Sequence, residues 1–578
     1  MYSNVVSASI CGLEAQIVHV EADVGMGLPV FEMSGFLGIE VKEARERVRA
    51  AIKNSGVELK PQRIVINISP ANIRKDGTGF DLPIALAILV ANNLVNEERL
   101  KDTLIVGELS LDGTIHGVKG ILPCVSAAVD SGITTCIVPM ENRKEAAIVD
   151  GIRVLAVENL EQVIAYLNGK IELTEEEHTE GVLSAFLIGH SREAEENHEK
   201  AVYIEEGKEK SIQENHLIGD DGNDEDFSDI RGQYMAKRAT MIAVAGMHNI
   251  IYIGTPGSGK SMLAKRIPTI MPDLSYEESL EVTKICSVAG ILEKDEGLIH
   301  KRPFRSPHHN ITEAAMLGGG AIPRPGEITL AGKGVLFLDE MTEFKSTILE
   351  SLRQPLEDKK ITLVRLDAAY TYPADFMLAA AMNPCKCGYY PDRTRCTCTE
   401  HDIRRYMGKI SAPMWDRFDL CVKTDEIKFA DLQDDKSINH DCKVQNVRDG
   451  LTENQEDREE NKKENKKDNI RVMTTAYMKQ QVEHARQIQQ KRFAGRKINF
   501  NSEMNTRDIK KYCQLNEQCQ KIMEAGFEKL QLTARGYHKI LKTARTIADL
   551  DGCEQIELIH LSEAMGYRSC DISLNKLN

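Results

Sequence analysis

The stretch Gly254-Thr255-Pro256-Gly257-Ser258-Gly259-Lys260-Ser261 follows four apolar residues, Ile250-Ile251-Tyr252-Ile253, and precedes an amphipathic segment. It fits all eight positions of a phosphate-binding loop (P-loop), whose glycines let backbone N–H groups surround a polyphosphate. The helix expected next directs its positive end at the same oxygens. Lys260 would contact the β- and γ-phosphates, and the Ser261 hydroxyl would ligate Mg²⁺. The sequence predicts a nucleoside triphosphate site, with a chance glycine-rich turn as the alternative.

Two further apolar runs end in polar residues of the kind that nucleotide hydrolysis needs. Gly334-Val-Leu-Phe-Leu ends in Asp339 and Glu340. Asp339 is expected to orient the Mg²⁺ shell, and Glu340 to polarise the water that attacks the γ-phosphate. Leu378-Ala-Ala-Ala-Met ends in Asn383, whose amide would hold that water or the γ-phosphate. Taken alone, Asn383 could equally be a turn residue.

These three elements, in this order, resemble an AAA+ ATPase, in which Asn383 would be sensor 1. The resemblance implies that each site is completed by an arginine of a neighbouring subunit, and therefore an oligomer, expected to be a homo-hexameric ring. Arg417 matches the position of this arginine finger, and an ion pair with Asp416 or Asp419 is the alternative. Arg535 matches sensor 2, and a solvated helix arginine is the alternative.

The residues between these elements resemble the magnesium-chelatase-like ATPases of the YifB/ComM family over nearly the whole chain except two linkers. The resemblance implies an Mg²⁺-dependent ATPase that acts as a DNA motor, a branch-migration helicase in recombination and natural transformation. Single-stranded or branched DNA and recombination or competence proteins would be its partners. Nucleotide-driven protein remodelling or a metal-chelatase-type motor subunit is the alternative. The strings that carry the resemblance include Arg302-Pro-Phe-Arg-Ser-Pro-His308-His309, Leu317-Gly-Gly-Gly320, Leu349-Glu-Ser-Leu-Arg353-Gln-Pro-Leu-Glu357 and Ala544-Arg-Thr-Ile-Ala-Asp-Leu550.

Two strings depart from the family pattern. The family usually has Ala-His before the Asp-Glu strand, where this chain has Ala331-Gly-Lys333, and its Ser-Gly-Pro-Leu-Leu-Asp-Arg reads Ser411-Ala-Pro-Met-Trp-Asp-Arg here. Neither change removes a phosphate or metal ligand. The resemblance also makes His308 and His309 part of the ATPase core rather than a metal site, since the pair lacks a third ligand nearby.

Changes of composition divide the chain into five parts, and the fold class is α/β. Residues 1–168 alternate strands and helices, and 169–226 form an acidic linker. Residues 227–427 alternate strands and helices as an AAA+ parallel sheet would, and 428–470 form a charged low-complexity insert. Residues 471–578 are helical in pattern, as a C-terminal lid domain would be. A short helix over 183–187 is conceivable inside the linker.

The N-terminal part resembles the domain of Lon-type proteases. Gly79 occupies the position of the serine nucleophile, and Leu122 that of its lysine partner. Serine–lysine catalysis needs both groups, so protease activity is not expected. A basic face built from Lys60, Arg74 and Lys75 would suit DNA, with ordinary surface charge as the alternative.

Four cysteines, Cys385, Cys387, Cys396 and Cys398, lie close together in the sequence. Four thiolates satisfy a structural Zn²⁺, although Cys-x-Cys pairs are less specific than the usual Cys-x-x-Cys. Reduced thiols in a loop are the alternative. Arg393 and Arg395 between the pairs would also suit a basic contact element.

Composition limits the remaining possibilities. The chain has 578 residues, 14 cysteines, an apolar share of 42% and a net charge of −15. Scattered cysteines do not suggest a secreted disulfide framework, and the sequence shows neither a signal peptide nor a run apolar enough to span a membrane. A cytoplasmic protein is expected. The acidic total gives no support to DNA binding, but a local basic surface can coexist with it.

Overall fold

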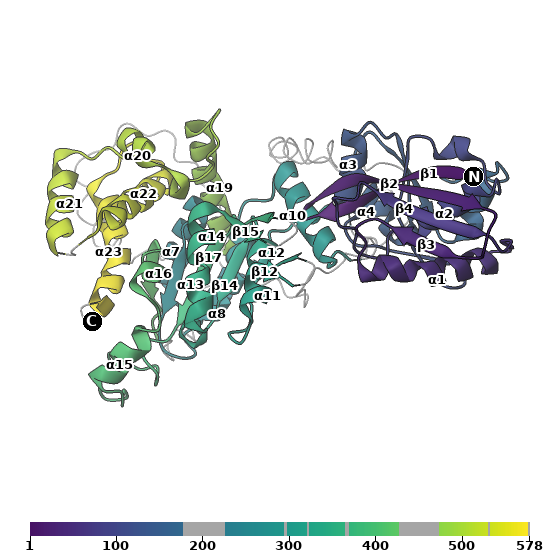
Figure 1. The fold of residues 1–578 in the computed structure, drawn as a ribbon. Coiled ribbons are helices and arrows are strands. Elements are labelled where there is room, and N and C mark those ends of the chain that lie inside the picture. The colour runs from purple at the N-terminus through teal and green to yellow at the C-terminus, as the bar shows by residue number, and fades with distance from the viewer. Residues whose placement is uncertain are drawn as a thin grey trace, which may run out of the picture.

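The computed structural model describes residues 1–176, 226–293, 297–320, 323–364, 369–426, 473–529 and 532–575. The described residues form an elongated arrangement of an N-terminal α/β domain, a central α/β core and a C-terminal helical domain (Figure 1). The helix considered over 183–187 lies outside the described residues.

The N-terminal domain is built on a seven-stranded mixed sheet of order β3-β4-β2-β1-β5-β8-β9. Its strands and helices carry two apolar clusters, one of which contains the wholly buried helix α2. The elements are β1 (Tyr2–Cys11), β2 (Glu14–Gly25), β3 (Phe31–Ser34), α1 (Ile39–Asn54), β4 (Arg63–Ser69), α2 (Asp81–Ala91), η1 (Glu97–Leu100), β5 (Thr103–Ile105), β6 (Glu108–Leu109), β7 (Ile115–His116), α3 (Ile121–Asp130), β8 (Thr135–Pro139), η2 (Met140–Asn142), α4 (Arg143–Ala146), β9 (Arg153–Val157) and α5 (Leu160–Leu167).

The central core is a five-stranded parallel sheet of order β11-β14-β17-β10-β18, with helices on its faces, which confirms the expected α/β ATPase fold. Its strands are β11 (Phe304–Arg305), β14 (Val335–Leu338), β17 (Met377–Met382), β10 (Ile250–Ile253) and β18 (Leu420–Lys423). Its helices are η3 (Phe227–Asp229), α7 (Tyr234–Gly246), α8 (Lys260–Lys265), α9 (Ile267–Ile270), α10 (Tyr276–Ala289), α11 (Glu313–Leu317), α12 (Glu327–Leu330), η4 (Met341–Glu343), α13 (Ser346–Ser351), α14 (Arg353–Asp358), α15 (Glu400–Met407) and α16 (Ala412–Trp415).

Two short hairpins project from this core. Strands β12 (Gly318–Gly319) and β13 (Arg324–Pro325) pair with each other, as do β15 (Lys360–Val364) and β16 (Ala369–Pro373). The second hairpin separates the helix α14 from the strand β17, which is followed by Asn383.

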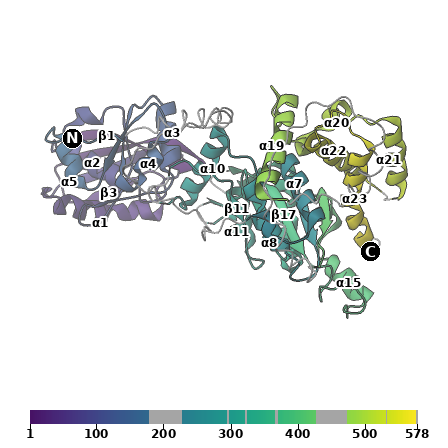
Figure 2. The same cartoon turned by 180° about the vertical axis from the view of Figure 1, so that it is seen from behind.

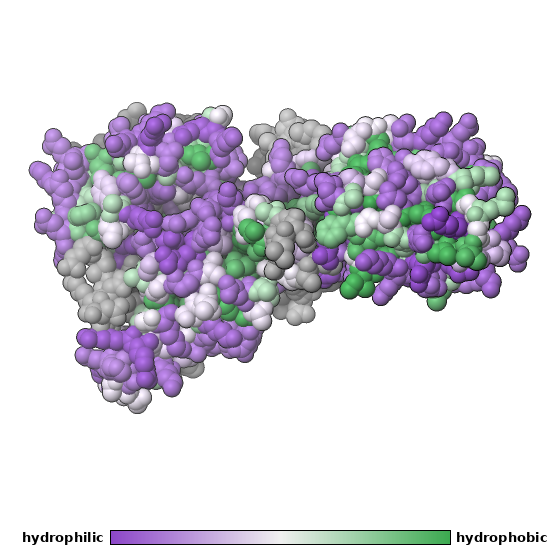
Figure 3. All heavy atoms as spheres, in the orientation of Figure 1, coloured by the Kyte–Doolittle hydropathy of each residue, from purple (hydrophilic) through white to green (hydrophobic). Residues whose placement is uncertain are grey.

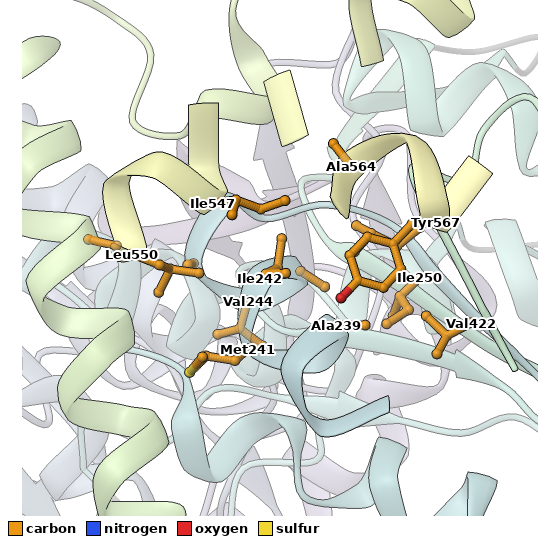
Figure 4. Packing of buried hydrophobic residues seen from close by; sticks show 14 of the residues in the cluster. Ala239, Met241, Ile242, Val244, Ile250, Val422, Ile547, Leu550, Ala564 and Tyr567 are labelled. Carbon is orange, nitrogen blue, oxygen red and sulfur yellow. The ribbon is translucent and has the colours of Figure 1, made fainter. Parts of the chain in front are cut away.

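The C-terminal domain is helical, as expected, and packs on the core through α7. Figure 4 shows Met241, Ile242 and Val244 of α7 among apolar side chains of two C-terminal helices, including Ile547 and Tyr567. The domain consists of α19 (Thr475–Arg492), η6 (Asn501–Glu503), α20 (Thr506–Tyr512), α21 (Glu517–Lys529), α22 (Ala534–Leu550) and α23 (Leu558–Asn575).

Helix α10 of the core joins the N-terminal domain, which lies at the opposite end from the C-terminal helices (Figure 2). The Ser287 hydroxyl donates to Glu145 Oε1 at 2.5 Å, and Gly120 N donates to Ser287 O at 3.1 Å. Leu122, Ile148 and Leu298 form a buried apolar cluster beside these bonds. Burial raises the pKa of Glu145, although the Ser287 hydroxyl and other donors oppose the shift.

The hydropathy of the surface differs between the two ends of the molecule. The face in Figure 3 is hydrophilic over much of the core and C-terminal domain, whereas apolar residues gather on the N-terminal domain. Met26, Leu28 and Ile39 are among its exposed apolar residues. No helix in the described ranges is long and apolar enough to cross a membrane.

Candidate nucleotide-binding site

The order of the strands brings the three predicted nucleotide motifs to one edge of the sheet. The P-loop follows β10, Asp339 and Glu340 follow β14, and Asn383 follows β17. Because all three strands are parallel and β17 lies between the other two, their carboxyl ends meet at the same edge. Ligands of open parallel sheets bind at this edge.

Lys260 is the buried centre of the site. Its ammonium group donates to Gly254 O at 2.9 Å, Thr255 O at 2.8 Å and Asn383 Oδ1 at 3.2 Å. Burial lowers the pKa of Lys260, while the carboxylates of Asp339 and Glu340 oppose this shift. The lysine and the sensor 1 candidate therefore lie together, as the sequence predicted.

The P-loop serine and the first acid of the Asp-Glu pair are in direct contact. Ser261 Oγ donates to Asp339 Oδ2 at 2.7 Å, and Asp339 Oδ1 accepts from Glu340 N at 2.9 Å. A hydroxyl and a carboxylate are hard oxygen ligands, so this donor set fits the Mg²⁺ that accompanies a nucleotide. Glu340 has a φ of 49°, a left-handed conformation that is uncommon for a residue with a side chain and recurs at functional sites.

Two residues that the sequence did not single out hold the P-loop in place. The Gln233 amide donates to Ser258 O at 3.2 Å and to Asp425 O at 2.6 Å, and its oxygen accepts from Asp425 N at 3.1 Å. The Thr424 hydroxyl bonds the Ser258 hydroxyl at 2.7 Å. Both contacts join residues far apart in the chain, so no local motif marks them.

The backbone of Arg417 lies at the amino-terminal end of β10, whereas Lys260 lies beyond the carboxyl end of the same strand. The Asn249 amide, just before β10, donates to Arg417 O at 3.0 Å, whereas Lys260 follows the carboxyl end of β10. Four strand residues span about 13 Å. The backbone of Arg417 is therefore about one strand length from the P-loop of its own chain.

Glu357 brings the two candidate arginines together. Its Oε1 lies 2.9 Å from Nη2 of Arg417 and 3.2 Å from Nη2 of Arg535. The alternative ion pairs of Arg417 are wrong, because Asp416 pairs with Arg568 and Asp419 with Lys539. Arg535 is 64% exposed, as a solvated arginine would be, yet it shares the partner of Arg417.

The C-terminal domain fixes the segment that carries Arg417. Lys539 of α22 and Arg568 of α23 both donate to Phe418 O, at 3.1 and 2.8 Å. Burial would raise the pKa of Asp419, but Lys539, 3.0 Å away, and His248 outweigh it and hold this pKa below its usual range. A movement of the helical domain would therefore move Arg417 with it.

The four predicted cysteine ligands converge beside the nucleotide site. Their sulfur atoms all lie within 4.8 Å of one another, and the Cys385–Cys387, Cys385–Cys396 and Cys387–Cys396 separations are 3.3, 3.7 and 3.5 Å. Tetrahedral ligands about 2.3 Å from Zn²⁺ lie about 3.8 Å apart. The cluster is thus compatible with one zinc ion.

The cysteine loop also touches the P-loop. A Cβ on Gly388 would lie 2.5 Å from Cδ of Pro256, and Gly388 has a φ of +88°. Arg393 and Arg395, considered for a basic contact element, stack on Tyr390 and Tyr389 and pair with acids of the same region. His308 and His309 stack on each other, and within the described residues no third ligand joins them in a metal-binding group.

The N-terminal residues named above do not form a basic face. Lys75 is fully buried and donates to Pro70 O, and Arg74 pairs with Asp76, so the expectation of a shared surface with Lys60 is wrong. Gly79 lies against Val106 and Val118, and Leu122 is buried at the junction with α10.

The matches to known protein families fall separately on the N-terminal domain, the core and the C-terminal domain. Residues 226–432 match the family model for magnesium chelatase, subunit ChlI, residues 20–142 match a second model for subunit ChlI, and residues 472–568 match its C-terminal model. The chain is 36% identical over 577 residues to competence protein ComM of Haemophilus influenzae, which covers 99% of both chains. It is also 36% identical to protein YifB of Escherichia coli, over 98% of this chain and 97% of the relative. The magnesium-chelatase 67 kDa subunit of Chlorobaculum tepidum is 26% identical over 162 residues, which is 27% of this chain and 23% of the relative.

The fold and the nucleotide site define an ATPase of the AAA+ class, with a magnesium-chelatase-like core. Within this class, the chain belongs to the YifB/ComM family.

Proposed function

We propose that this protein is an oligomeric, Mg²⁺-dependent ATPase that works as a motor on single-stranded or branched DNA. The carrying observation is the separation of Lys260 and Arg417 at opposite edges of one sheet. A head-to-tail ring, proposed to be a homo-hexamer, would place one edge against the other in each interface. The similarity to a competence protein supports DNA as the substrate and the cytoplasm as the location.

Each residue of the site has a part in hydrolysis. Lys260 exchanges Gly254 O and Thr255 O for the β- and γ-phosphate oxygens. Ser261 and Asp339 would hold Mg²⁺, which when bound offsets the charge of those phosphates. Glu340 draws a proton from water as the water oxygen bonds to γ-phosphorus, and the bond to the β-phosphate oxygen breaks to leave ADP and phosphate.

The remaining polar groups orient the reaction and stabilise its charge. Asn383, 3.2 Å from the Lys260 ammonium, is placed to hold the attacking water or the γ-phosphate. Arg417 and Arg535 would reach the nucleotide of a neighbouring subunit and act on the charge that develops in the transition state. Hydrolysis therefore requires the assembled ring.

The test is ATP hydrolysis by the purified protein with and without single-stranded DNA and a four-way junction. Lys260→Ala, which removes the ammonium from the P-loop, is the blank. Stimulation by DNA that disappears in Lys260→Ala supports the motor, and a branch-migration assay follows. A rate of ATP hydrolysis that neither DNA changes would contradict the proposed DNA motor.

The second candidate is a motor subunit for metal insertion or for protein remodelling. Its supporting observation is the match of the core to the magnesium chelatase subunit ChlI model. Hydrolysis that is unaffected by DNA but responds to a metal-free tetrapyrrole with its metal ion, or to an unfolded protein, would favour it.

We also propose that Cys385, Cys387, Cys396 and Cys398 bind a structural Zn²⁺. The sulfur separations support one ion rather than an iron–sulfur cluster, because bridging iron and sulfide atoms hold four thiolates farther apart. Elemental analysis of protein purified without added metal tests this, with one zinc per chain expected.

A further inference from the structure

The end of α19, the following loop and α20 form an exposed basic surface on the C-terminal domain. Within the described residues, five exposed cations of this segment form no ion pair with a carboxylate, although the whole chain is acidic. We call this the α19–α20 basic surface. Its cations are Lys491, Lys497, Arg507, Lys510 and Lys511.

The two acids inside this segment do not neutralise it. Asp508 is buried and forms an ion pair with Arg496. Glu503 pairs with Lys359 of the core and accepts from Asn499 N at 2.7 Å. Both carboxylates are committed to internal partners, and the exposed cations keep their net positive charge.

Internal contacts hold the two helix ends side by side. The rings of Phe493 and Tyr512 meet edge to face at 5.9 Å, and the Tyr512 hydroxyl donates to Arg492 O at 3.4 Å. Arg492 itself is anchored to the fully buried Asp549, with Nη1 2.6 Å from Oδ2. The Lys511 ammonium lies 4.8 Å from the centroid of the Tyr512 ring. The cations therefore lie on helix ends that internal packing holds in place.

Helix stability explains only part of this charge. Lys491, Lys510 and Lys511 lie in last turns, where cations favour the helix dipole. Arg507 lies in the first turn of α20, where a cation is disfavoured, and Lys497 lies outside any helix. Neither has an intramolecular carboxylate partner within the described residues. Neither helix stability nor an ion pair within the described residues therefore explains these two cations.

We propose that the α19–α20 basic surface binds the phosphate backbone of DNA, which rests on the proposed DNA motor function. Several cations spread over two helix ends and a loop suit a repeating polyanion, which exchanges condensed counterions for protein cations. Such contacts position DNA without reading its sequence. The surface would hold DNA while ATP hydrolysis at the sheet edge moves the domain.

The test compares two pairs of charge removals in the full chain. Lys510→Gln/Lys511→Gln and Lys497→Gln/Arg507→Gln alter the surface, whereas Lys521→Gln/Lys529→Gln removes two exposed lysines from α21 of the same domain. Binding of a fluorescein-labelled four-way junction is followed by anisotropy over a range of salt concentrations. Basal ATP hydrolysis and thermal unfolding report on the integrity of each variant.

We expect each surface pair to weaken binding about tenfold at moderate salt and to reduce the magnitude of the slope of log K against log salt by about 1.8, since each of the two lost duplex phosphate contacts contributes about 0.9. Basal hydrolysis and the α21 pair should match the parent protein. If the parent protein binds the junction and both surface variants keep the parent's affinity and salt slope, this inference alone is overturned. A parent protein that binds no DNA overturns the motor function with it.

Discussion

Arg417 and Arg535 bond one and the same oxygen, Glu357 Oε1. The two arginines come from different domains, and Arg417 is 9% exposed while Arg535 is 64% exposed. Two like charges at one point repel unless an anion lies between them. The Glu357 carboxylate supplies that anion within the chain, and in the proposed ring the triphosphate of a neighbouring subunit would have the charge to replace it.

The first prediction concerns sites shared between subunits. Arg417→Ala should lower ATP hydrolysis about 10³-fold or more, as expected for an arginine finger, and leave ATP binding by the same chain intact. Lys260→Ala should also be inactive. When the two inactive variants are mixed in equal amounts and allowed to reassemble, about one quarter of the interfaces would pair an intact P-loop with an intact Arg417.

The measurement is the ATPase rate of the mixture against each variant alone. Recovery near one quarter of the parent rate supports a trans-acting Arg417. The control mixture of Lys260→Ala with Lys260→Ala/Arg417→Ala contains no intact P-loop and should stay inactive. A mixture as inactive as its components, in rings shown to exchange subunits, would rule out an Arg417 that acts on a neighbouring subunit.

The second prediction separates binding from hydrolysis at Glu340. Glu340→Gln keeps the size of the side chain but cannot accept the proton of the attacking water, so the rate should fall about 10²–10⁴-fold. Affinity for a fluorescent ATP analogue should stay within a few fold, because Lys260 and the Ser261–Asp339 pair remain. Equal losses of affinity and rate would argue that Glu340 supports the fold of the loop instead.

Local motifs indicated which residues meet at the candidate nucleotide site, because each of them follows an apolar strand. Lys260, Asp339 and Asn383 were found in this way and lie together as expected. Gln233 and Glu357 escaped notice, since their importance comes from contacts with residues distant in the chain. A sequence pattern does not show which strands become neighbours.

The fold of the N-terminal domain shows the same limit. The alternation of strands and helices in this domain was predicted from the sequence, but the long antiparallel pair β1–β2 was not. In β1 the buried positions include Ser3, Ser7 and Ser9, so the alternation of apolar and polar residues is hidden. Lys75 was assigned to the surface by its charge, although its ammonium is satisfied internally by Pro70 O.

The third prediction links the cysteine cluster to ATP hydrolysis. Cys385 lies two residues after Asn383, and Gly388 packs on Pro256 of the P-loop. Cys396→Ser should therefore lose zinc and lower both ATP affinity and rate. Cys421→Ser, a buried cysteine outside the cluster, is the matched control and should retain one zinc per chain. Loss of zinc without any change in hydrolysis would mean that the metal stabilises only the cysteine loop.

A related variant tests the contact itself without touching a thiol. Gly388→Ala places a Cβ against Pro256 at a φ of +88°, which strains the loop. The expected result is a full zinc content with weakened ATP binding, measured by titration of the fluorescent analogue. Weakened zinc binding with normal ATP binding would contradict a connection through Pro256.

The last prediction uses the buried ammonium of Lys237 in α7. The residue is 4% exposed, and burial lowers its pKa from 10.5 to about 8, with Asp226 opposing the shift. Below about pH 8 the lysine is charged in both states, so the penalty for burying the charge is fully present. Between about pH 8 and 10.5 the unfolded chain binds more protons, and the free energy of unfolding rises with pH through this group.

Lys237→Met keeps an unbranched side chain of similar length and removes the charge. At pH 7 it should raise the free energy of unfolding of the core by up to about 3 kcal/mol, since one pKa unit corresponds to about 1.4 kcal/mol. The gain should shrink above pH 8 and vanish near pH 10.5. Thermal unfolding at pH 7, 8, 9 and 10 measures it, with the exposed Lys265→Met as control. A gain that is the same at every pH would come from packing rather than from the buried charge, because only the charge is linked to protons.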